Sequence, residues 1–313
     1  MAIRNYQPGD EAAQVAIYNE AAGDLPKFKP ANIDEVRRRF QSKDFDPTTR
    51  FYAEEGGKVV GYSSFHAVSG RISYPWVLKG RPQHQEPLFQ AVLNGMRKRG
   101  RKIAFAAYRG DWPPITQFFQ ARDFRLMREM INFVIDIVEM PTPAASPSLP
   151  FSPLRREDIP TMRDLAPEAL RVSTDAELEK HLFANPYFSS DGVIVLRSRT
   201  AGTPVAVGIL IANASYSDPK QVDPFMPCFR LGAFGTEGMD CKRINGLFSF
   251  LCRAGRDVSA MALDLMGHAA FRLEETSTAW LGAQVPSDVP HLLRFYQQHF
   301  RRQGSFPVFE RTL

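Results

Sequence analysis

The chain has 313 residues, of which 44% are hydrophobic and 23% are charged. This length exceeds the range over which one hydrophobic core keeps growing, so we expect two domains. No apolar run approaches the roughly 18 residues of a membrane span, and the first residues lack a signal-peptide pattern. The three cysteines, an odd number, argue against a disulfide framework. We therefore expect a cytoplasmic protein without a membrane partner.

The net charge of +5 comes from the first half of the chain. Much of it is one run, residues 97–102, which ends a helical pattern and contains Gly100 where a helix would stop. Cations are favourable at a helix C-terminus, and we prefer this structural interpretation. A patch for nucleic acid or another anionic surface is the alternative. Because the run contains no aromatic residue for base stacking, we expect no nucleic-acid partner.

One pattern occurs twice, on either side of a proline-rich segment. A polar stretch ending at Asp10 is followed by the strand-like residues 57–62, and one ending at Asp158 is followed, after a similar distance, by residues 204–209. Each copy closes with an aromatic pair, Phe118-Phe119 or Phe295-Tyr296. The period of about 148 residues is the size of a domain. We predict domains at 1–140 and 153–313, joined by a linker at 141–152.

In the first copy, Asp10 is a suitable helix N-cap, and Gly56-Gly57 is suited to a hairpin turn. The patterns predict, in chain order, helices at 11–22 and 32–42, a hairpin over 51–65, a strand at 72–78, a helix at 88–98, a strand at 102–108, a helix at 114–120 and a strand at 124–138.

The second copy repeats this order with different lengths. Its patterns predict helices at 159–170 and 174–183, strands at 192–197, 205–212 and 229–234, a helix at 244–254, a strand at 260–265, a helix at 289–299 and a strand at 306–310. Strands and helices that interleave in this way predict an α/β fold, with a mixed central sheet flanked by helices in each domain.

This order, the Val-Val-Gly hairpin at residues 59–61 and the aromatic-rich last helix resemble the GCN5-related N-acetyltransferase (GNAT) family. The doubling resembles its tandem members of the mycothiol synthase type. The resemblance implies an acyl-CoA donor, with acetyl-CoA expected, and direct transfer to an amine. The six histidines show no metal-ligand spacing, so we expect no metal. We therefore expect an N-acyltransferase for a small amine, as a monomer or homodimer. The alternative is a non-catalytic GNAT-like module that binds CoA or another ligand.

The family also implies a pyrophosphate cradle, Arg/Gln-x-x-Gly-x-Gly/Ala, between the fourth strand and the next helix. Phosphates favour exposed N–H groups at a helix N-terminus. In the second copy Arg243 and Gly246 fit this pattern, whereas Phe248 replaces a small residue; alternatively, Gly246 and Phe248 are packing residues. The expected CoA contacts are Gly238, Met239, Arg243, Ile244, Asn245, Gly246, Leu247 and Phe248.

The first copy departs from this pattern at the matching place. There His84 and Glu86 stand where the glycines would be, and Pro82 and Pro87 remove two amide donors. A carboxylate facing the phosphates would repel them. We expect that this copy cannot hold CoA and that the second copy carries the activity.

The resemblance implies that a Tyr on the last helix protonates the leaving thiolate. Aligning the aromatic pairs places Tyr296 there, opposite Phe119 of the first copy, whereas aligning from the next Phe places Phe295 there. Glu237, after the predicted strand at 229–234, is the candidate base, or else an exposed turn carboxylate. Asp264 either binds the amine or is a paired structural carboxylate.

Overall fold

The computed structural model describes residues 2–42, 45–141, 148–170, 174–184, 191–212, 246–255, 257–273 and 276–313. The chain divides into two compact units. Unit 1 comprises Met1–Glu129 together with Ser305–Leu313, and unit 2 comprises Met130–Gly304. The predicted domains were 1–140 and 153–313. The observed units differ from them because residues 130–140 belong to unit 2 and residues 305–313 belong to unit 1.

Unit 1 contains a four-stranded antiparallel sheet in the order β1-β2-β3-β4. A further strand, β5, pairs antiparallel with the end of β12 through Ile103↔Thr312 to Ala107↔Val308. The elements of this unit are β1 (Ala2–Asn5), α1 (Asp10–Ala22), α2 (Ile33–Phe40), β2 (Arg50–Glu55), β3 (Lys58–Ser64), β4 (Trp76–Val77), α3 (Gln85–Lys98), β5 (Ile103–Ala107), α4 (Pro113–Gln120) and the start of β6 (Arg125–Asp136), with short 3-10 turns at Pro47–Thr49 and Pro82–His84.

Unit 2 is a mixed sheet in the order β6-β11-β10-β9-β8-β7. Its strands pair antiparallel except β10 and β11, which are parallel. The elements are β7 (Phe151–Pro153), α5 (Ile159–Leu165), α6 (Pro167–Leu170), α7 (Asp175–Phe183), β8 (Val193–Arg197), β9 (Pro204–Ile211), β10 (Gly246–Cys252), α9 (Val258–Leu273), β11 (Trp280–Pro286), α10 (Pro290–His299) and the start of β12 (Arg301–Thr312), with 3-10 turns at Ile137–Glu139 and Arg156–Asp158.

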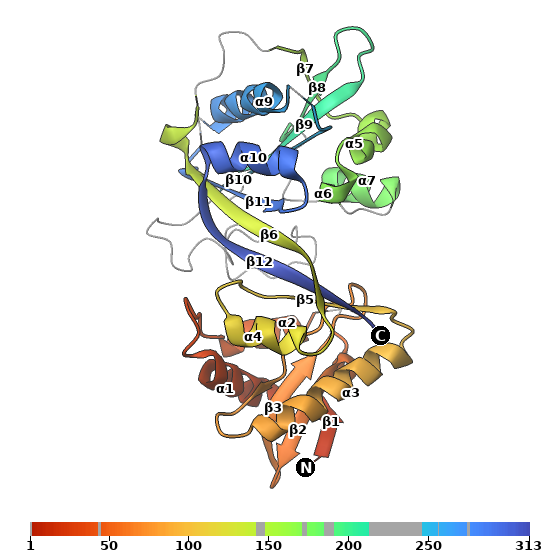
Figure 1. The fold of residues 1–313 in the computed structure, drawn as a ribbon, viewed down its shortest axis with the longest axis vertical. Coiled ribbons are helices and arrows are strands. Elements are labelled where there is room, and N and C mark those ends of the chain that lie inside the picture. Colours follow the sequence, from red (N-terminus) through yellow and green to blue (C-terminus); the bar gives the residue numbers. More distant parts are fainter. Residues whose placement is uncertain are drawn as a thin grey trace. The chain divides into compact units, whose positions relative to one another are not determined.

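The two copies therefore exchange their last strands. The end of β6, from the first copy, pairs with β11 in unit 2 from Met130↔Pro286 to Asp136↔Trp280. The end of β12, from the second copy, pairs with β5 in unit 1, as Figure 1 also shows. Each unit thus completes its core with a segment from the other copy: Phe133 lies in the core of unit 2 and Phe309 in that of unit 1.

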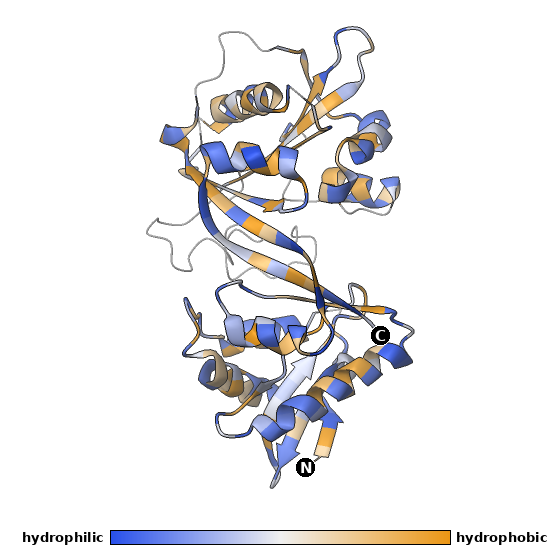
Figure 2. Cartoon of the chain, viewed as in Figure 1, coloured by the Kyte–Doolittle hydropathy of each residue, from blue (hydrophilic) through white to orange (hydrophobic). Residues whose placement is uncertain are grey.

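Most predicted elements of the first copy are confirmed, for identifiable reasons. The β2–β3 hairpin turns at Gly56 and Gly57, whose φ angles of 56° and 75° favour glycine. Helix α2 is capped by Asn32, whose side chain accepts from the Asp34 N–H at 2.8 Å. Hydrophobic and hydrophilic residues alternate along α3 (Figure 2), and its buried face consists of Leu88, Phe89, Val92, Leu93 and Met96.

The predicted cap at Asp10 is wrong. Gly9 is the N-cap residue of α1, and Asp10 is the first residue of the helix. The Asp10 carboxylate instead accepts two hydrogen bonds from the Arg4 guanidinium, at 2.7 and 2.9 Å, and one from the Gln7 N–H. This buried side chain fastens β1 to α1.

Two predicted elements of the second copy are also wrong. Residues predicted as a helix at 244–254 form strand β10 from Gly246, and the predicted strand at 260–265 lies inside helix α9. A short apolar run such as residues 247–252 fits a buried strand as well as a helix segment. Pairing with β9 decides the matter, because it aligns six consecutive residue pairs, from Leu247↔Ile211 to Cys252↔Ala206. Within the described part of the chain, no helix is long and apolar enough to span a bilayer.

Candidate functional site

The predicted cradle residues that the structure describes do not form a cradle. Gly246, Leu247 and Phe248 are buried in β10, where they pair with neighbouring strands. A Cβ atom added to Gly246 would lie 2.6 Å from Leu281 Cδ2 and 2.7 Å from Thr278 Cγ2. Gly246 is therefore required for close packing, and Phe248 belongs to the core. The predicted residues Glu237, Gly238, Met239, Arg243, Ile244 and Asn245 lie outside the described residues.

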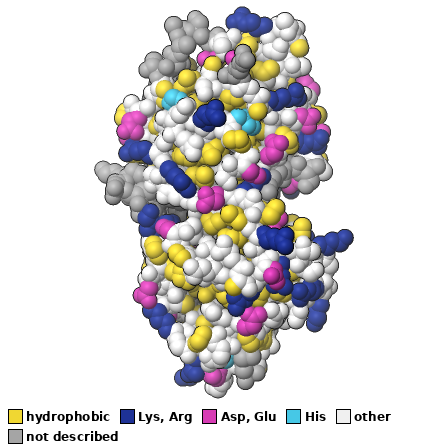
Figure 3. Space-filling view, viewed as in Figure 1, with side chains coloured by type: hydrophobic (Ala, Val, Ile, Leu, Met, Phe, Trp, Pro, Cys, Tyr) yellow, Lys and Arg dark blue, Asp and Glu magenta, His cyan; other side chains and the backbone are white. Residues whose placement is uncertain are grey.

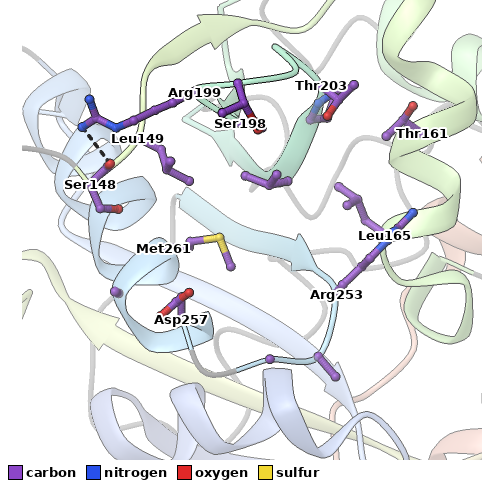
Figure 4. A pocket seen from close by; sticks show the side chains of 16 residues that line it. Ser148, Leu149, Thr161, Leu165, Ser198, Arg199, Thr203, Arg253, Asp257 and Met261 are labelled. Carbon is purple, nitrogen blue, oxygen red and sulfur yellow. Dashed lines mark hydrogen bonds between the residues drawn. The ribbon is translucent and has the colours of Figure 1, made fainter.

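The segment that joins the strand to the helix lies about ten residues further along. It runs from Arg253 to Asp257, between β10 and α9. A cavity of about 820 Å³ opens beside it. Arg253, Gly255 and Asp257 line one side. The β8–β9 turn with Arg199, helix α5, the segment before β7 and the first turn of α9 also contribute to the lining (Figure 4). Among the described residues, this cavity, rather than residues 246–248, lies at the junction from strand to helix that a cradle requires.

The charges around the cavity are mixed, with a positive excess. Arg199 and Arg253 approach from two sides (Figure 4), and the N-terminus of the 16-residue helix α9 adds a partial positive charge. Arg199 donates to the Ser148 carbonyl at 3.1 Å, whereas Arg253 has no ion pair with another described residue. Asp257 opposes this charge at the start of the helix. The arrangement can accept an anionic group near Arg253.

A second feature lies between β10 and β11. Their parallel pairing is limited to Gly246↔Leu281 and Leu247↔Gly282, although β11 pairs with β6 over its whole length. Beyond these pairs, backbone groups of β10 meet side chains of α10. The Phe250 N–H donates to the Tyr296 hydroxyl at 3.2 Å, and His291 Nε2 lies 3.0 Å from the Cys252 carbonyl. Side chains of α10 thus contact backbone groups of β10 that β11 would otherwise contact if the two strands stayed paired.

Tyr296 is fully buried, with Phe133 and Phe250 stacked against its ring. Burial raises the pKa of its hydroxyl well above the ordinary value, and hydrogen bonds from Phe250 and Ser249 lower it only in part. The hydroxyl therefore keeps its proton at neutral pH. It can act as a proton donor, but it is unsuited to act as a base.

The starts of the two equivalent helices favour Tyr296 over Phe295 as the counterpart of Phe119. Helix α4 begins at Pro113 after Trp112, whose φ and ψ are −113° and 67°. Helix α10 begins at Pro290 after Val289, whose φ and ψ are −119° and 72°. Counting from each proline pairs Phe119 with Tyr296. The distance to the next Phe is one residue longer in the first copy, from 119 to 124 against 296 to 300, and the additional residue lies in the turn after α4, which ends at Gln120.

Two other side chains near this region are structural. Asp264 lies in α9, not in a strand, and its carboxylate accepts from the Ser148 N–H at 2.9 Å and from the Ser148 hydroxyl. It therefore holds the segment before β7 and does not face an amine. Burial raises the pKa of the Cys252 thiol to about 12, so this cysteine is not a thiolate nucleophile at neutral pH.

At the start of α3 in unit 1, charged and buried side chains take part in contacts of their own. His84 is buried in the 3-10 turn before the helix, and Arg81 pairs with Glu55 at 2.9 Å. Glu86 lies in the first turn of α3 and binds Arg122 at 2.8 Å. Burial would raise the pKa of Glu86, but hydrogen bonds from Gln90 and Arg122 outweigh it and lower the value. A carboxylate that stays ionised here opposes phosphate binding.

Sequence reasoning missed Arg199, Arg253 and Gly255. A usable signal was present, because Gly255 stands between an apolar run, residues 247–252, and a segment with helical spacing at Val258, Ala262, Leu265 and Ala269. Such a glycine indicates a loop. Arg199 could not be found in this way, because only the fold brings the β8–β9 turn to the cavity.

Neither a family model nor a curated protein sequence matches the chain. Solved structures do match over nearly the whole chain. A GCN5-related N-acetyltransferase from Sphaerobacter thermophilus is 13% identical, with coverage of 99% of this chain and 95% of that one and a TM-score of 0.66. A tandem GNAT protein from the clavulanic acid biosynthesis pathway is 13% identical, with 99% and 98% coverage and a TM-score of 0.56.

A third structure comes from a fungal multi-domain β-N-acetylglucosaminidase that contains a GCN5-related glucosamine N-acetyltransferase region. It is 14% identical, with coverage of 99% of this chain but 38% of that one and a TM-score of 0.65. At these identities the likeness establishes the fold alone. The chain therefore has an α/β fold of two GNAT-like domains in tandem.

Proposed function

We propose that this protein is an acyl-CoA-dependent N-acyltransferase whose active site lies in unit 2. The observation that carries the proposal is the cavity at the junction of β10 and α9, which Arg253 and Arg199 line. Where the pairing of β10 with β11 ends, the Phe250 N–H of β10 donates to the buried Tyr296 hydroxyl of α10. The comparisons support the fold of an acetyltransferase, and acetyl-CoA is the donor we propose. The acceptor is a small amine.

Each group has a defined task in this proposal. Arg253, Arg199 and the N–H groups at the start of α9 bind the diphosphate of the donor. The Phe250 N–H, which here donates to the buried Tyr296 hydroxyl, exchanges that contact for the thioester carbonyl and stabilises the oxyanion that forms when the amine attacks. The carbon–sulfur bond then breaks, and Tyr296 gives its proton to the thiolate. Glu237 is the proposed base for the amine.

Calorimetry with acetyl-CoA tests donor binding. We expect a submillimolar Kd that Arg253→Glu weakens by at least about 10-fold, because a like charge replaces the cation at the phosphates. Arg155→Glu is the matched control: Arg155 is an exposed arginine of unit 2 that pairs loosely with Glu157, at 3.7 Å. Equal weakening by both variants, or no binding by the wild type, would contradict the proposal. Thiol release with a panel of amines then tests transfer.

One observation favours a second candidate, a non-catalytic GNAT-like binding module. The Phe250 N–H is bonded to Tyr296 and the start of α9 carries Asp257, so donor binding must displace one contact and tolerate the other. A protein that binds acetyl-CoA yet releases no thiol with any amine would favour this module. The resemblance to the mycothiol synthase type concerns the doubled fold, and neither proposal depends on it.

A further inference from the structure

We propose that unit 1 carries a surface for peripheral binding to an anionic phospholipid bilayer, at the C-terminal end of α3. We call it the basic surface. It consists of the cations Arg71, Arg97, Lys98, Arg99, Arg101 and Lys102 and of the aliphatic residues Val68 and Ile103. In Figure 3, several Lys and Arg side chains line one side of unit 1.

Two segments that are distant in sequence form this surface. A tight loop over residues 66–71 is closed by hydrogen bonds from the Gly70 N–H to the His66 carbonyl, at 2.9 Å, and from the His66 N–H to the Arg71 carbonyl, at 2.8 Å. The loop packs against the residues after α3: a Cβ atom on Gly70 would lie 2.9 Å from the Ile103 carbonyl oxygen and 3.2 Å from Arg101 Nη2. Val68 at the loop tip therefore lies beside the cationic run.

Several of these cations keep their charge available to an external partner. Lys98 and Lys102 are exposed and have no ion pair with another described residue. The Arg97 guanidinium donates to the neutral Asn94 side chain, at 3.1 Å, and also has no ion pair within the described part of the chain. Arg99 differs, because it pairs with Asp46 at 2.7 Å and lies over the Phe65 ring. The favourable position at a helix C-terminus explains why the cations are tolerated here, but their side chains still point a net positive charge outward.

A cavity adjoins the same surface. It has a volume of about 430 Å³ and opens beside Lys98 and Arg99, with Asn94 and Thr48 as further polar neighbours. No carboxylate is among its described lining residues. Arg4 also lines it, but Asp10 and Glu54 bind this guanidinium. The cavity thus offers one unpaired ammonium group and neutral donors, which suit a phosphate headgroup.

The aliphatic residues distinguish a bilayer from a nucleic acid. The side chain of Val68 is 80% exposed and that of Ile103 is 49% exposed, although both are hydrophobic and lie among cations. A phosphodiester backbone has no apolar surface that could bury these side chains. The interface of a bilayer buries them, and its anionic headgroups bind the cations at the same time. The expectation of no membrane partner rested on the lack of a spanning run, which a peripheral surface does not require.

Sedimentation of the full chain with vesicles tests the proposal. We expect binding to vesicles that contain phosphatidylglycerol, no binding to phosphatidylcholine alone, and loss of binding in high salt. Each cation near an anionic bilayer contributes about fivefold to binding. The triple variant Arg97→Glu, Lys98→Glu, Lys102→Glu should therefore weaken binding on the order of 100-fold. The neutral variant with Gln at these positions should also lose binding, and it leaves the helix end less perturbed.

The matched control reverses three other exposed lysines of unit 1, as Lys27→Glu, Lys29→Glu and Lys58→Glu, and should bind like the wild type. Equal losses in the control and test variants would show that net charge alone acts, and this would overturn the proposal. So would wild-type binding to duplex RNA without binding to anionic vesicles.

A second pair of variants tests the aliphatic contribution. Val68→Ser should weaken vesicle binding about fivefold, because it removes apolar surface that the bilayer buries. Val138→Ser is the control, since Val138 is even more exposed, at 87%, but belongs to unit 2. Identical binding by Val68→Ser and the wild type would overturn insertion of the loop.

Discussion

The two units place the same elements in the same order, but they differ where a helix follows the fourth strand. In unit 2 the junction of β10 and α9 borders a cavity of about 820 Å³ with two arginines. In unit 1 the start of α3 holds the buried His84 and the ionised Glu86, and the rings of Phe89, Phe118 and Phe119 pack together nearby. The comparison teaches that this fold keeps its scaffold although the side chains at this junction differ between the two units.

A second comparison concerns an acidic residue that both units use in the same way. The Asp10 carboxylate binds Arg4 of β1 through two hydrogen bonds, and the Asp158 carboxylate binds Arg197 of β8 through two, at 2.7 and 2.8 Å. Each carboxylate also accepts a nearby backbone N–H. The clamp is repeated, but the arginine comes from a different strand. Both units therefore have the same carboxylate–guanidinium pair, although the arginine lies on β1 in unit 1 and on β8 in unit 2.

The largest expected effects test the strand exchange. Phe309→Ala should destabilise unit 1, and Phe133→Ala should destabilise unit 2, each by about 3–5 kcal/mol, because each ring is buried in the core of the unit formed mainly by the other copy. Tryptophan fluorescence during urea unfolding separates the units. Trp76 and Trp112 report on unit 1, whereas Trp280 reports on unit 2. Each substitution affecting only the unit of its own copy would show that the strands are not exchanged.

The next prediction contrasts Tyr296 with Phe119. If Tyr296 protonates the thiolate, Tyr296→Phe should lower kcat on the order of 100-fold and leave the affinity for acetyl-CoA nearly unchanged. Phe119→Tyr should leave kcat unchanged. The buried position of Phe119, stacked on Tyr108, predicts a loss of stability for that variant, since the new hydroxyl must find a partner. A wild-type kcat for Tyr296→Phe between pH 6 and 9 would assign Tyr296 to the core.

Glycines of the two units provide a smaller and purely structural test. Gly246→Ala should cost about 2 kcal/mol, because the added methyl group meets Leu281 and Thr278 at less than 3.0 Å. Gly61→Ala should cost unit 1 a similar amount, since Val77 and Leu88 are as close. Gly255→Ala is the control, with no atom within 4 Å of the new Cβ. Thermal unfolding measures all three, and a neutral Gly246→Ala would remove the packing role from this residue.

The smallest expected effect depends on pH. A hydrogen bond from Arg197 lowers the pKa of Asp158 below its ordinary value of 3.8, and burial opposes this shift only in part. The ion pair therefore contributes its full stability above pH 3.8, and the contribution is lost as the pH falls below that value. Between pH 4 and pH 2 the wild type should lose this part of its unfolding free energy. We expect Asp158→Asn to lose less over the same range, by on the order of 1 kcal/mol, because its side chain does not titrate. An unchanged acid slope would contradict this assignment.

The sequence predicted elements whose ends depend on local chemistry. Gly56-Gly57 defined the first hairpin, and Pro113 and Pro290 begin equivalent helices. It failed at residues 246–273, where an apolar run without clear periodicity was assigned to a helix. Pairing with β9 makes it a strand, and such pairing between distant residues is not visible in a single sequence.

The candidate site was predicted less well than the fold. Tyr296 was proposed because an aromatic pair recurs near the end of each copy, and its catalytic role stays a prediction. Gly246, Leu247 and Phe248 were assigned to a cradle because the run that forms β10 was predicted to be a helix. Arg199 belongs to a turn that reaches the cavity only through the sheet order.

The exchange of strands also has a consequence for synthesis on the ribosome. Unit 1 pairs β5 with residues 308–312, so slightly more than two hundred positions separate the two partners in the sequence. While unit 2 is being translated, β5 lacks this partner and exposes one edge, which is a site for wrong pairing or aggregation. The first copy therefore waits for the last strand of the second before its fold is complete. Chaperone dependence and slow maturation should follow from this order of synthesis.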